Sequence, residues 1–155
     1  METARDLLAA QPFLAGLTGR QLDKLSYWSR RQVFRAGARV FEEGGRADRF
    51  WLLKDGRVAL DTEVPGRGGV VVESLGPGAV LGWSWLFPPY RWHFGARAIG
   101  TLQATAFDAE QLRVLADQDP RLGYLLTRQL LSVVLDRLQS TRARLLDLYG
   151  SPYHD

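Results

Sequence analysis

The sequence predicts a mainly β domain, an antiparallel barrel or sandwich, with helices before and after it. Twelve glycines divide residues 30–108 into short runs rich in Val, Phe, Trp and Leu, a pattern typical of short strands joined by tight turns. Apolar residues on either side of that region recur at helical spacing. The chain has 155 residues, which is the size of a single domain that can bury its own core.

Composition restricts the classes of function. The 20 Lys and Arg exceed the 17 Asp and Glu by three, and no run of five like charges occurs, so we expect a mixed, solvated surface rather than a nucleic-acid patch. The absence of cysteine excludes disulfides and thiolate zinc sites. No apolar run reaches the roughly 18 residues of a membrane span, and the N-terminus does not resemble a signal peptide. We therefore expect a cytoplasmic protein with no membrane association.

Residues 1–28 are expected to form short helices. Pro12 is expected to separate two of them, because proline lacks an amide donor and disfavours helix interiors. Thr18 has a side chain suited to a helix N-cap, and Leu22 and Leu25 share one face of the helix that follows.

Residues 29–108 contain the expected strands. The Lys54-Asp55-Gly56-Arg57 segment is predicted to form a hairpin turn, because Asp-Gly tolerates positive φ angles. A looser hairpin loop is predicted at residues 65–69, Pro-Gly-Arg-Gly-Gly. The β-prone runs are residues 33–34, 39–41, 50–53, 58–60, 70–72 and 102–107.

Residues 109–149 return to helical spacing. Asp108 is expected to cap a short helix, and Pro120 to begin a long helix over residues 120–149, since proline is favoured in a first turn. Gly150 is expected to end that helix. Two apolar stripes run along it: Leu122, Leu126, Leu130 and Val133 form one, and Tyr124, Leu131, Val134, Leu138, Thr141, Leu145 and Leu148 form the other.

A helix that is apolar on two faces must bury both of them. We expect the first stripe to pack on the barrel. From Leu131 onward the second stripe steps by three and four residues, which is the spacing of a coiled coil, so we expect it to pack on a partner helix. One broad face packed inside a monomer is the alternative. The predicted seam of a homodimer consists of Leu131, Val134, Leu138, Leu145 and Leu148.

Three segments of the β-rich region carry motifs at consistent spacing. They are residues 41–51, FEEGGRADRFW, residues 53–58, LKDGRV, and residues 75–82, LGPGAVLG. Together they resemble the cyclic nucleotide-binding domain of the catabolite-activator family of bacterial regulators, over about residues 12–148. The resemblance implies a jelly-roll-like, antiparallel β-roll flanked by short N-terminal helices and a long C-terminal dimerisation helix, and a site for a cyclic nucleotide.

The resemblance places a ligand cassette at residues 82–97. Gly82 allows a ligand to approach backbone amides at the start of a short helix, and Ser84 can add a hydroxyl. In the family an acid follows this glycine and accepts a hydrogen bond from the ribose. Here the following residue is Trp83, whose indole has no acceptor.

Two arginines are candidates for contacting a cyclic phosphate. Arg91 is the first, although the family's arginine falls nearest Trp92, and a shift of one residue turns a strand side chain to the other face. Arg97 is the second, at a strand start where the resemblance also implies a structural arginine. The resemblance places Thr141 of the long helix toward the nucleotide base across a dimer, and a hydroxyl bonded to its own helix is the alternative.

Aromatic side chains are denser in the cassette than elsewhere, and two interpretations remain open. The rings form an enlarged pocket for a different ligand, or they fill the nucleotide cavity and leave a fold without ligand. The aromatic residues concerned are Trp83, Trp85, Phe87, Tyr90, Trp92 and Phe94, and Leu86 among them is a further candidate for contacting the ligand.

These observations predict a stand-alone sensor domain that is homodimeric through its long helix. It would bind cyclic AMP, cyclic GMP or a related small molecule and regulate an unidentified protein partner in trans. The alternative is a ligand-free dimeric interaction module whose pocket is filled by the Trp-rich cassette. The sequence has no helix-turn-helix after residue 149, so we expect no direct DNA binding.

We expect no enzymatic activity, no metal and no cofactor. The sequence contains neither a nucleophile elbow nor a metal-binding His pair. Glu42, Glu43 and Asp48 fall in the barrel-turn motif, where we expect the Asp48 side chain to accept hydrogen bonds from backbone amides of the turn rather than to take part in catalysis.

Overall fold

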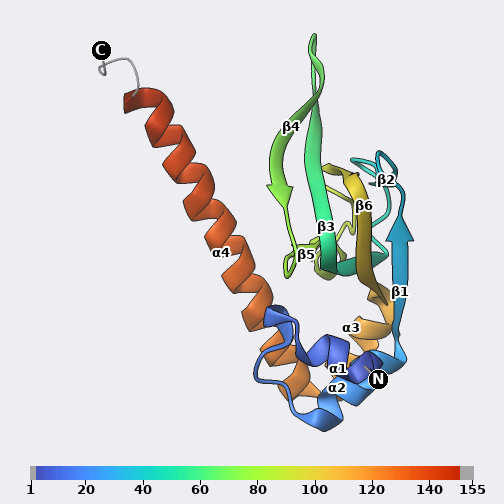
Figure 1. The fold of residues 1–155 in the computed structure, drawn as a ribbon. Helices are drawn as coiled ribbons and strands as arrows, with labels where there is room; N and C mark the ends of the chain where they lie inside the picture. Colours follow the sequence, from blue (N-terminus) through green and yellow to red (C-terminus); the bar gives the residue numbers. More distant parts are fainter. Residues whose placement is uncertain (1–2, 151–155) are drawn as a thin grey trace.

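The computed structural model describes residues 3–150, in which a β-roll lies between two helical ends (Figure 1). The predicted fold class is confirmed. The first helical end contains α1 (Ala4–Ala9), the 3-10 turn η1 (Pro12–Leu14) and α2 (Gly19–Tyr27). The roll contains β1 (Ser29–Phe34), β2 (Arg39–Phe41), β3 (Arg49–Val64), β4 (Gly68–Leu75), β5 (Val80–Leu81), η2 (Ser84–Leu86) and β6 (Gly95–Asp108). The second helical end contains α3 (Ala109–Gln118) and α4 (Pro120–Gly150).

Side-chain caps set the helix starts at the predicted residues. At α2, the Thr18 hydroxyl accepts a hydrogen bond from the Gln21 amide, and the Gln21 side chain accepts one from the Thr18 amide. The carboxylate of Asp108 accepts from the Gln111 amide at the start of α3. Pro120 is the first residue of α4, where its missing amide donor costs nothing.

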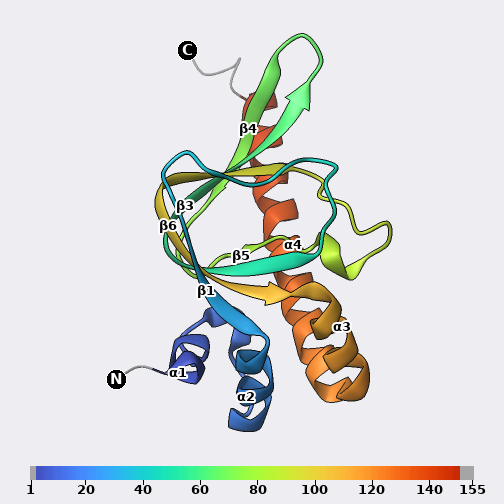
Figure 2. The ribbon, with the colours of Figure 1, turned by 90° about the vertical axis from the view of Figure 1, so that its right-hand side faces the viewer.

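The strands form one antiparallel sheet that curls on itself (Figure 2). Its main order is β1-β6-β3-β4, while β2 pairs with β6 and β5 pairs with β3. The long strands β3 and β6 pair with each other along most of their length. In addition, β6 pairs with β1 and β2, and β3 pairs with β5. Their inward side chains form the core, in which Phe50 and Phe107 are both 1% exposed and stack with ring centroids 4.7 Å apart.

The prediction of a hairpin turn at residues 54–57 is wrong. β3 is continuous from Arg49 to Val64, and both of its halves pair with β6. Gly56 has a φ of 91°, and the register with β6 shifts twice, between Leu53 and Asp55 and again between Asp55 and Arg57. The Asp-Gly pair does supply the positive φ expected of it, but the chain uses it for a β-bulge, because β6 offers partners on both sides of the glycine. The loop predicted after Val64 does connect β3 to β4.

The long helix α4 packs chiefly through its N-terminal half. Leu122, Leu126 and Leu130 are buried, as predicted for the first stripe, and they belong to the same hydrophobic core as the inward side chains of the strands. The backbone of α4 lies closest to α3 and η1. The C-terminal half extends on the β4 side of the roll and diverges from the β3–β4 hairpin toward its end, as Figure 1 shows. There Arg144 Nη1 donates to the Val72 carbonyl at 2.8 Å.

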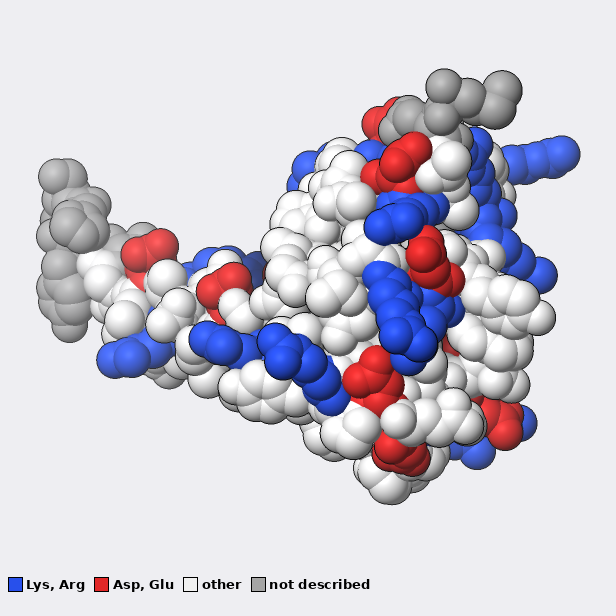
Figure 3. Space-filling model, turned by 90° about the horizontal axis from the view of Figure 1, so that it is seen from below, with Lys and Arg blue, Asp and Glu red and all other residues white. Residues whose placement is uncertain are grey.

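The surface of the described residues is mixed in charge on the face that Figure 3 shows. Basic and acidic side chains alternate over the body, and α4 extends from it as an arm with much uncharged surface. No helix between residues 3 and 150 combines the length and the apolar character that a membrane span requires.

We expect Gly56→Ala to lower the free energy of unfolding by about 2–4 kcal/mol, because a Cβ there would lie 2.4 Å from the Thr101 carbonyl oxygen in a backbone conformation that is already unfavourable. Gly66→Ala is the matched control. Its φ of 81° is similar but nothing lies within 4 Å of the new atom, so it should cost only about 1–2 kcal/mol. Urea unfolding measures both, and equal costs would contradict the close packing of the bulge on β6.

Candidate functional site

The cassette begins where β5 meets the loop that leads to β6. Gly82 follows the last residue of β5 and has a φ of 87°, which turns the chain sharply. The helix expected after it is a single 3-10 turn over Ser84–Leu86, and Trp83 at its N-cap makes no capping hydrogen bond through its side chain. A turn this short presents fewer free backbone amides than the N-terminus of an α-helix, which is the usual phosphate-binding site of this kind in proteins.

The Trp92 indole fills the space beside Gly82. A Cβ built on Gly82 would lie 2.7 Å from the ring carbon Cζ3 of Trp92. The Trp92 side chain is 5% exposed and stacks on Phe41, with ring centroids 4.0 Å apart and planes 15° from parallel. The remaining cavity has a volume of about 20 Å³, which is room for about one water molecule.

Backbone hydrogen bonds hold Trp92 in this position. Its amide donates to the Gly45 carbonyl at 2.9 Å, and its carbonyl accepts from the Gly44 amide at 2.8 Å. Because side chains alternate along an extended chain, the neighbouring Arg91 points outward: it is exposed, its backbone pairs with Arg46, and it does not line the cavity. The register noted in the sequence thus places an indole inward, at the position where the resemblance implies an arginine.

Other predicted residues of the cassette lie in two places. Trp83 stacks on His93 with centroids 5.7 Å apart, and the Ser84 hydroxyl lies 2.9 Å from His93 Nδ1. These side chains line the small cavity. Trp85 and Leu86 point elsewhere: Trp85 is 2% exposed, with its ring centroid 5.2 Å from that of Phe50 in the core, and Leu86 packs against the same core.

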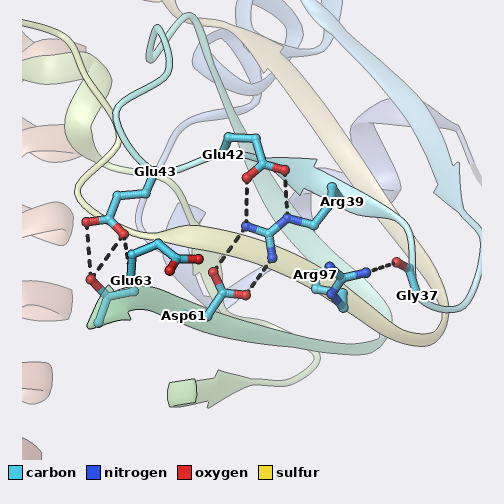
Figure 4. A network of polar contacts seen from close by, with 8 residues as sticks. Gly37, Arg39, Glu42, Glu43, Asp61, Glu63 and Arg97 are labelled. Atoms are coloured by element: carbon cyan, nitrogen blue, oxygen red, sulfur yellow. Dashed lines mark hydrogen bonds and ion pairs between the residues drawn. The ribbon is translucent and has the colours of Figure 1, made fainter. Parts of the chain in front are cut away.

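Two further candidates do not line the cavity. Arg97 Nη1 donates to the Gly37 carbonyl at 2.6 Å, which ties the start of β6 to the loop before β2 (Figure 4). Thr141 lies on an exposed part of α4. Of the predicted ligand residues, the structure therefore brings together Gly82, Trp83, Ser84 and Trp92, and it leaves Trp85, Leu86, Arg91, Arg97 and Thr141 outside the cavity.

Arg137 of α4 lines the cavity, and the sequence analysis did not single it out. Its Nη2 donates to the Val80 carbonyl at 2.7 Å, and its Nε lies 4.0 Å from a carboxylate oxygen of Glu73. Burial lowers the pKa of the Arg137 guanidinium, and the charge of Glu73 opposes that effect. The sequence could have pointed to Arg137 because it lies one helical turn before Thr141, and residues four apart share a helix face.

The acidic residues of the barrel-turn motif serve the fold. Arg39 pairs with Glu42 and with Asp61, and its Nη2 lies 3.1 Å from Asp61 Oδ1 (Figure 4). The hydrogen bond to Asp61 is the main cause of the raised pKa of Arg39. Glu43 accepts a hydrogen bond from the Glu63 amide at 3.0 Å. The contacts of Arg39 and Glu43 connect the turn to β3. Within residues 3–150 the hydrogen bonds of Asp48 are made by its backbone, and the predicted bond from the Asp48 side chain to the turn is not among them.

A curled antiparallel sheet, a glycine-opened cassette after β5 and a long C-terminal helix beside that cassette define a cyclic nucleotide-binding domain. Residues 31–119 match the family model described as "Cyclic nucleotide-binding domain". The chain belongs to this family.

Solved and curated relatives agree with this assignment. A candidate cyclic nucleotide-binding protein from Geobacter metallireducens superposes with a TM-score of 0.79 at 30% identity, covering 89% of this chain and 99% of that one. A CRP-like cAMP-activated global transcriptional regulator from Mycobacterium tuberculosis is 29% identical over 74% of this chain and 50% of its own length. Glutaminase 1 of Bradyrhizobium diazoefficiens is 29% identical over 88% of this chain, which spans only 22% of the glutaminase.

We expect Gly82→Ala to destabilise the protein by about 2–4 kcal/mol, because its Cβ would meet the Trp92 ring at a positive φ. In a Trp92→Ala background the same change should cost only the backbone penalty of about 1–2 kcal/mol. A double-mutant cycle of urea unfolding free energies measures the difference. Additive effects would show that the indole does not press on Gly82.

Proposed function

We propose that the protein is a dimeric regulatory interaction module of the cyclic nucleotide-binding family whose nucleotide site is closed by its own indole. One observation carries the proposal: the space beside Gly82 is reduced to about 20 Å³ by Trp92. Pockets for small organic ligands usually measure about 300–1,000 Å³. A cyclic nucleotide therefore fits only if the indole leaves a buried, stacked position.

The chemistry of the cassette supports the same proposal. Trp83 offers no acceptor for a ribose hydroxyl, and Arg91 lies outside the cavity. The groups left to meet a phosphate are the Ser84 hydroxyl, which contacts His93, and the Arg137 guanidinium, which donates to the Val80 carbonyl. Binding a nucleotide would have to replace both contacts and also displace Trp92.

A cyclic AMP or cyclic GMP sensor is the second candidate. It is favoured by the similarity to the M. tuberculosis regulator, whose name states that cAMP activates it. It also gives a role to Arg137, a basic side chain at the wall of the site. In that case the loop over residues 83–94 would open to admit the ligand and would shift α4 relative to the roll.

The exposed apolar face of α4 supports a homodimer. Leu131, Leu138 and Leu148 are 67%, 63% and 72% exposed in the single chain. Full burial of each leucine would stabilise a dimer by roughly 1.5–3 kcal/mol. The same helix of a second copy presents apolar residues at the same spacing and can therefore cover this face. Val134, Thr141 and Leu145 lie on the same side of the helix. Through this seam the module would bring two rolls together and present them to a protein partner, without catalysis of its own.

We expect cyclic AMP and cyclic GMP at about 1 mM to leave the melting temperature unchanged, because a ligand stabilises only a protein that has a site for it. Differential scanning calorimetry measures the melting temperature, and AMP at the same concentration is the control. A rise of several degrees with a cyclic nucleotide and not with AMP would contradict the closed site and favour the sensor.

We expect Leu138→Glu to convert a dimer to a monomer, because two carboxylates would be buried at the centre of the seam. Leu146→Glu is the matched control: Leu146 is 59% exposed on the same helix but lies outside the predicted seam. Light scattering should show a monomer for the first variant and a dimer for the second. A dimer in both would refute the seam.

A further inference from the structure

An open cleft lies between α4, the β4–β5 turn and η1. Its volume is about 370 Å³, which falls within the range of pockets for small organic ligands. Arg137 lines both this cleft and the closed cassette, so its side chain forms the wall between them. The cleft is therefore a separate space, far larger than the cavity beside Gly82.

The two walls of the cleft differ in character. The wall formed by η1, β4 and β5 is apolar except for Glu73, and the wall formed by α4 is polar except for Val133. The apolar side chains are Pro12, Phe13, Leu75 and Val80. The polar side chains on α4 are Gln129, Ser132, Asp136 and Ser140. Such a cleft suits a molecule with an apolar body and a polar head.

The charges of the lining favour a cationic head. The lining contains one basic side chain, Arg137, and two acidic ones, Glu73 and Asp136, so its net charge is −1. Arg137 is engaged by the Val80 carbonyl and lies near Glu73. Within residues 3–150 no Lys or Arg comes within 4.0 Å of the Asp136 carboxylate, which leaves it free to meet a cation.

The cleft and the dimer seam lie on different sides of α4. At about 100° per residue, the six α4 positions that line the cleft, 129, 132, 133, 136, 137 and 140, are centred about 145° around the helix from positions 131, 134, 138, 145 and 148. A homodimer formed through the seam would leave the cleft open to solvent. Occupancy of the cleft is thus compatible with the dimer and needs no movement of Trp92.

We propose that this cleft binds a small organic cation with an apolar ring or chain. The apolar body lies against Phe13, Leu75 and Val80, and the ammonium or guanidinium head lies at Asp136. This site goes beyond the proposed function, because the cassette is closed whether or not the cleft is occupied.

Phenethylamine and phenylacetate test the proposal, since they share a benzyl group and carry opposite charges. Titration followed by ¹H–¹⁵N NMR of the full chain should show millimolar binding of phenethylamine, as expected for a ligand this small. The shifted amides should lie around residues 12–13, 75–80 and 129–140. Phenylacetate should bind at least fivefold more weakly. No binding of phenethylamine, or equal binding of the two probes, would overturn the proposal.

Two variants separate the cleft from general charge effects. Asp136→Asn should weaken phenethylamine binding about three- to fivefold, the usual effect of one partly exposed ion pair. Asp147→Asn is the matched control: it removes the same charge from the same flank of α4, about 16 Å further along the helix, and should leave affinity unchanged. Ser132→Trp should block the cleft and abolish binding. Equal effects of the two Asp variants, or unchanged binding in Ser132→Trp, would overturn the proposal.

Discussion

The contact between the Trp92 indole and the backbone at Gly82 determines what the cassette can do. Gly82 lacks a side chain, so an aromatic ring can reach the peptide chain at a place where a nucleotide could otherwise lie. Stacking on Phe41 and two backbone hydrogen bonds to residues 44 and 45 hold that ring. Because the indole is buried and paired on all these sides, moving it would cost several kcal/mol of packing energy. The state of the whole module depends on this contact.

Local signals in the sequence were sufficient for most of the fold. Thr18, Asp108 and Pro120 mark helix starts because their chemistry acts within one turn of the chain. The Asp-Gly pair at residues 55–56 led to a wrong turn because a positive φ serves bulges as well as hairpins. Only the pairing partner, β6, distinguishes the two, and pairing over some 45 residues of separation is not visible in a local pattern.

The candidate site was harder to predict than the fold, since it depends on side-chain direction. The sequence placed Gly82, Trp83 and Ser84 together because they are consecutive. It could not decide between Arg91 and Trp92, because one residue of register exchanges the inward and outward positions. Arg137 was missed because it lies within a helix interpreted by its apolar stripes. Its importance arises from the approach of α4 to Val80 and Glu73, which are more than fifty residues away in the chain.

The bond from Arg144 to the Val72 carbonyl has a consequence for β4. β4 lies at the end of the main strand order, so one side of its backbone has no neighbouring strand. Unpaired strand edges recruit other chains and promote aggregation. By donating to a carbonyl on this strand, Arg144 occupies one backbone acceptor and brings a charged side chain to β4. Charged side chains beside an edge strand disfavour the addition of another strand.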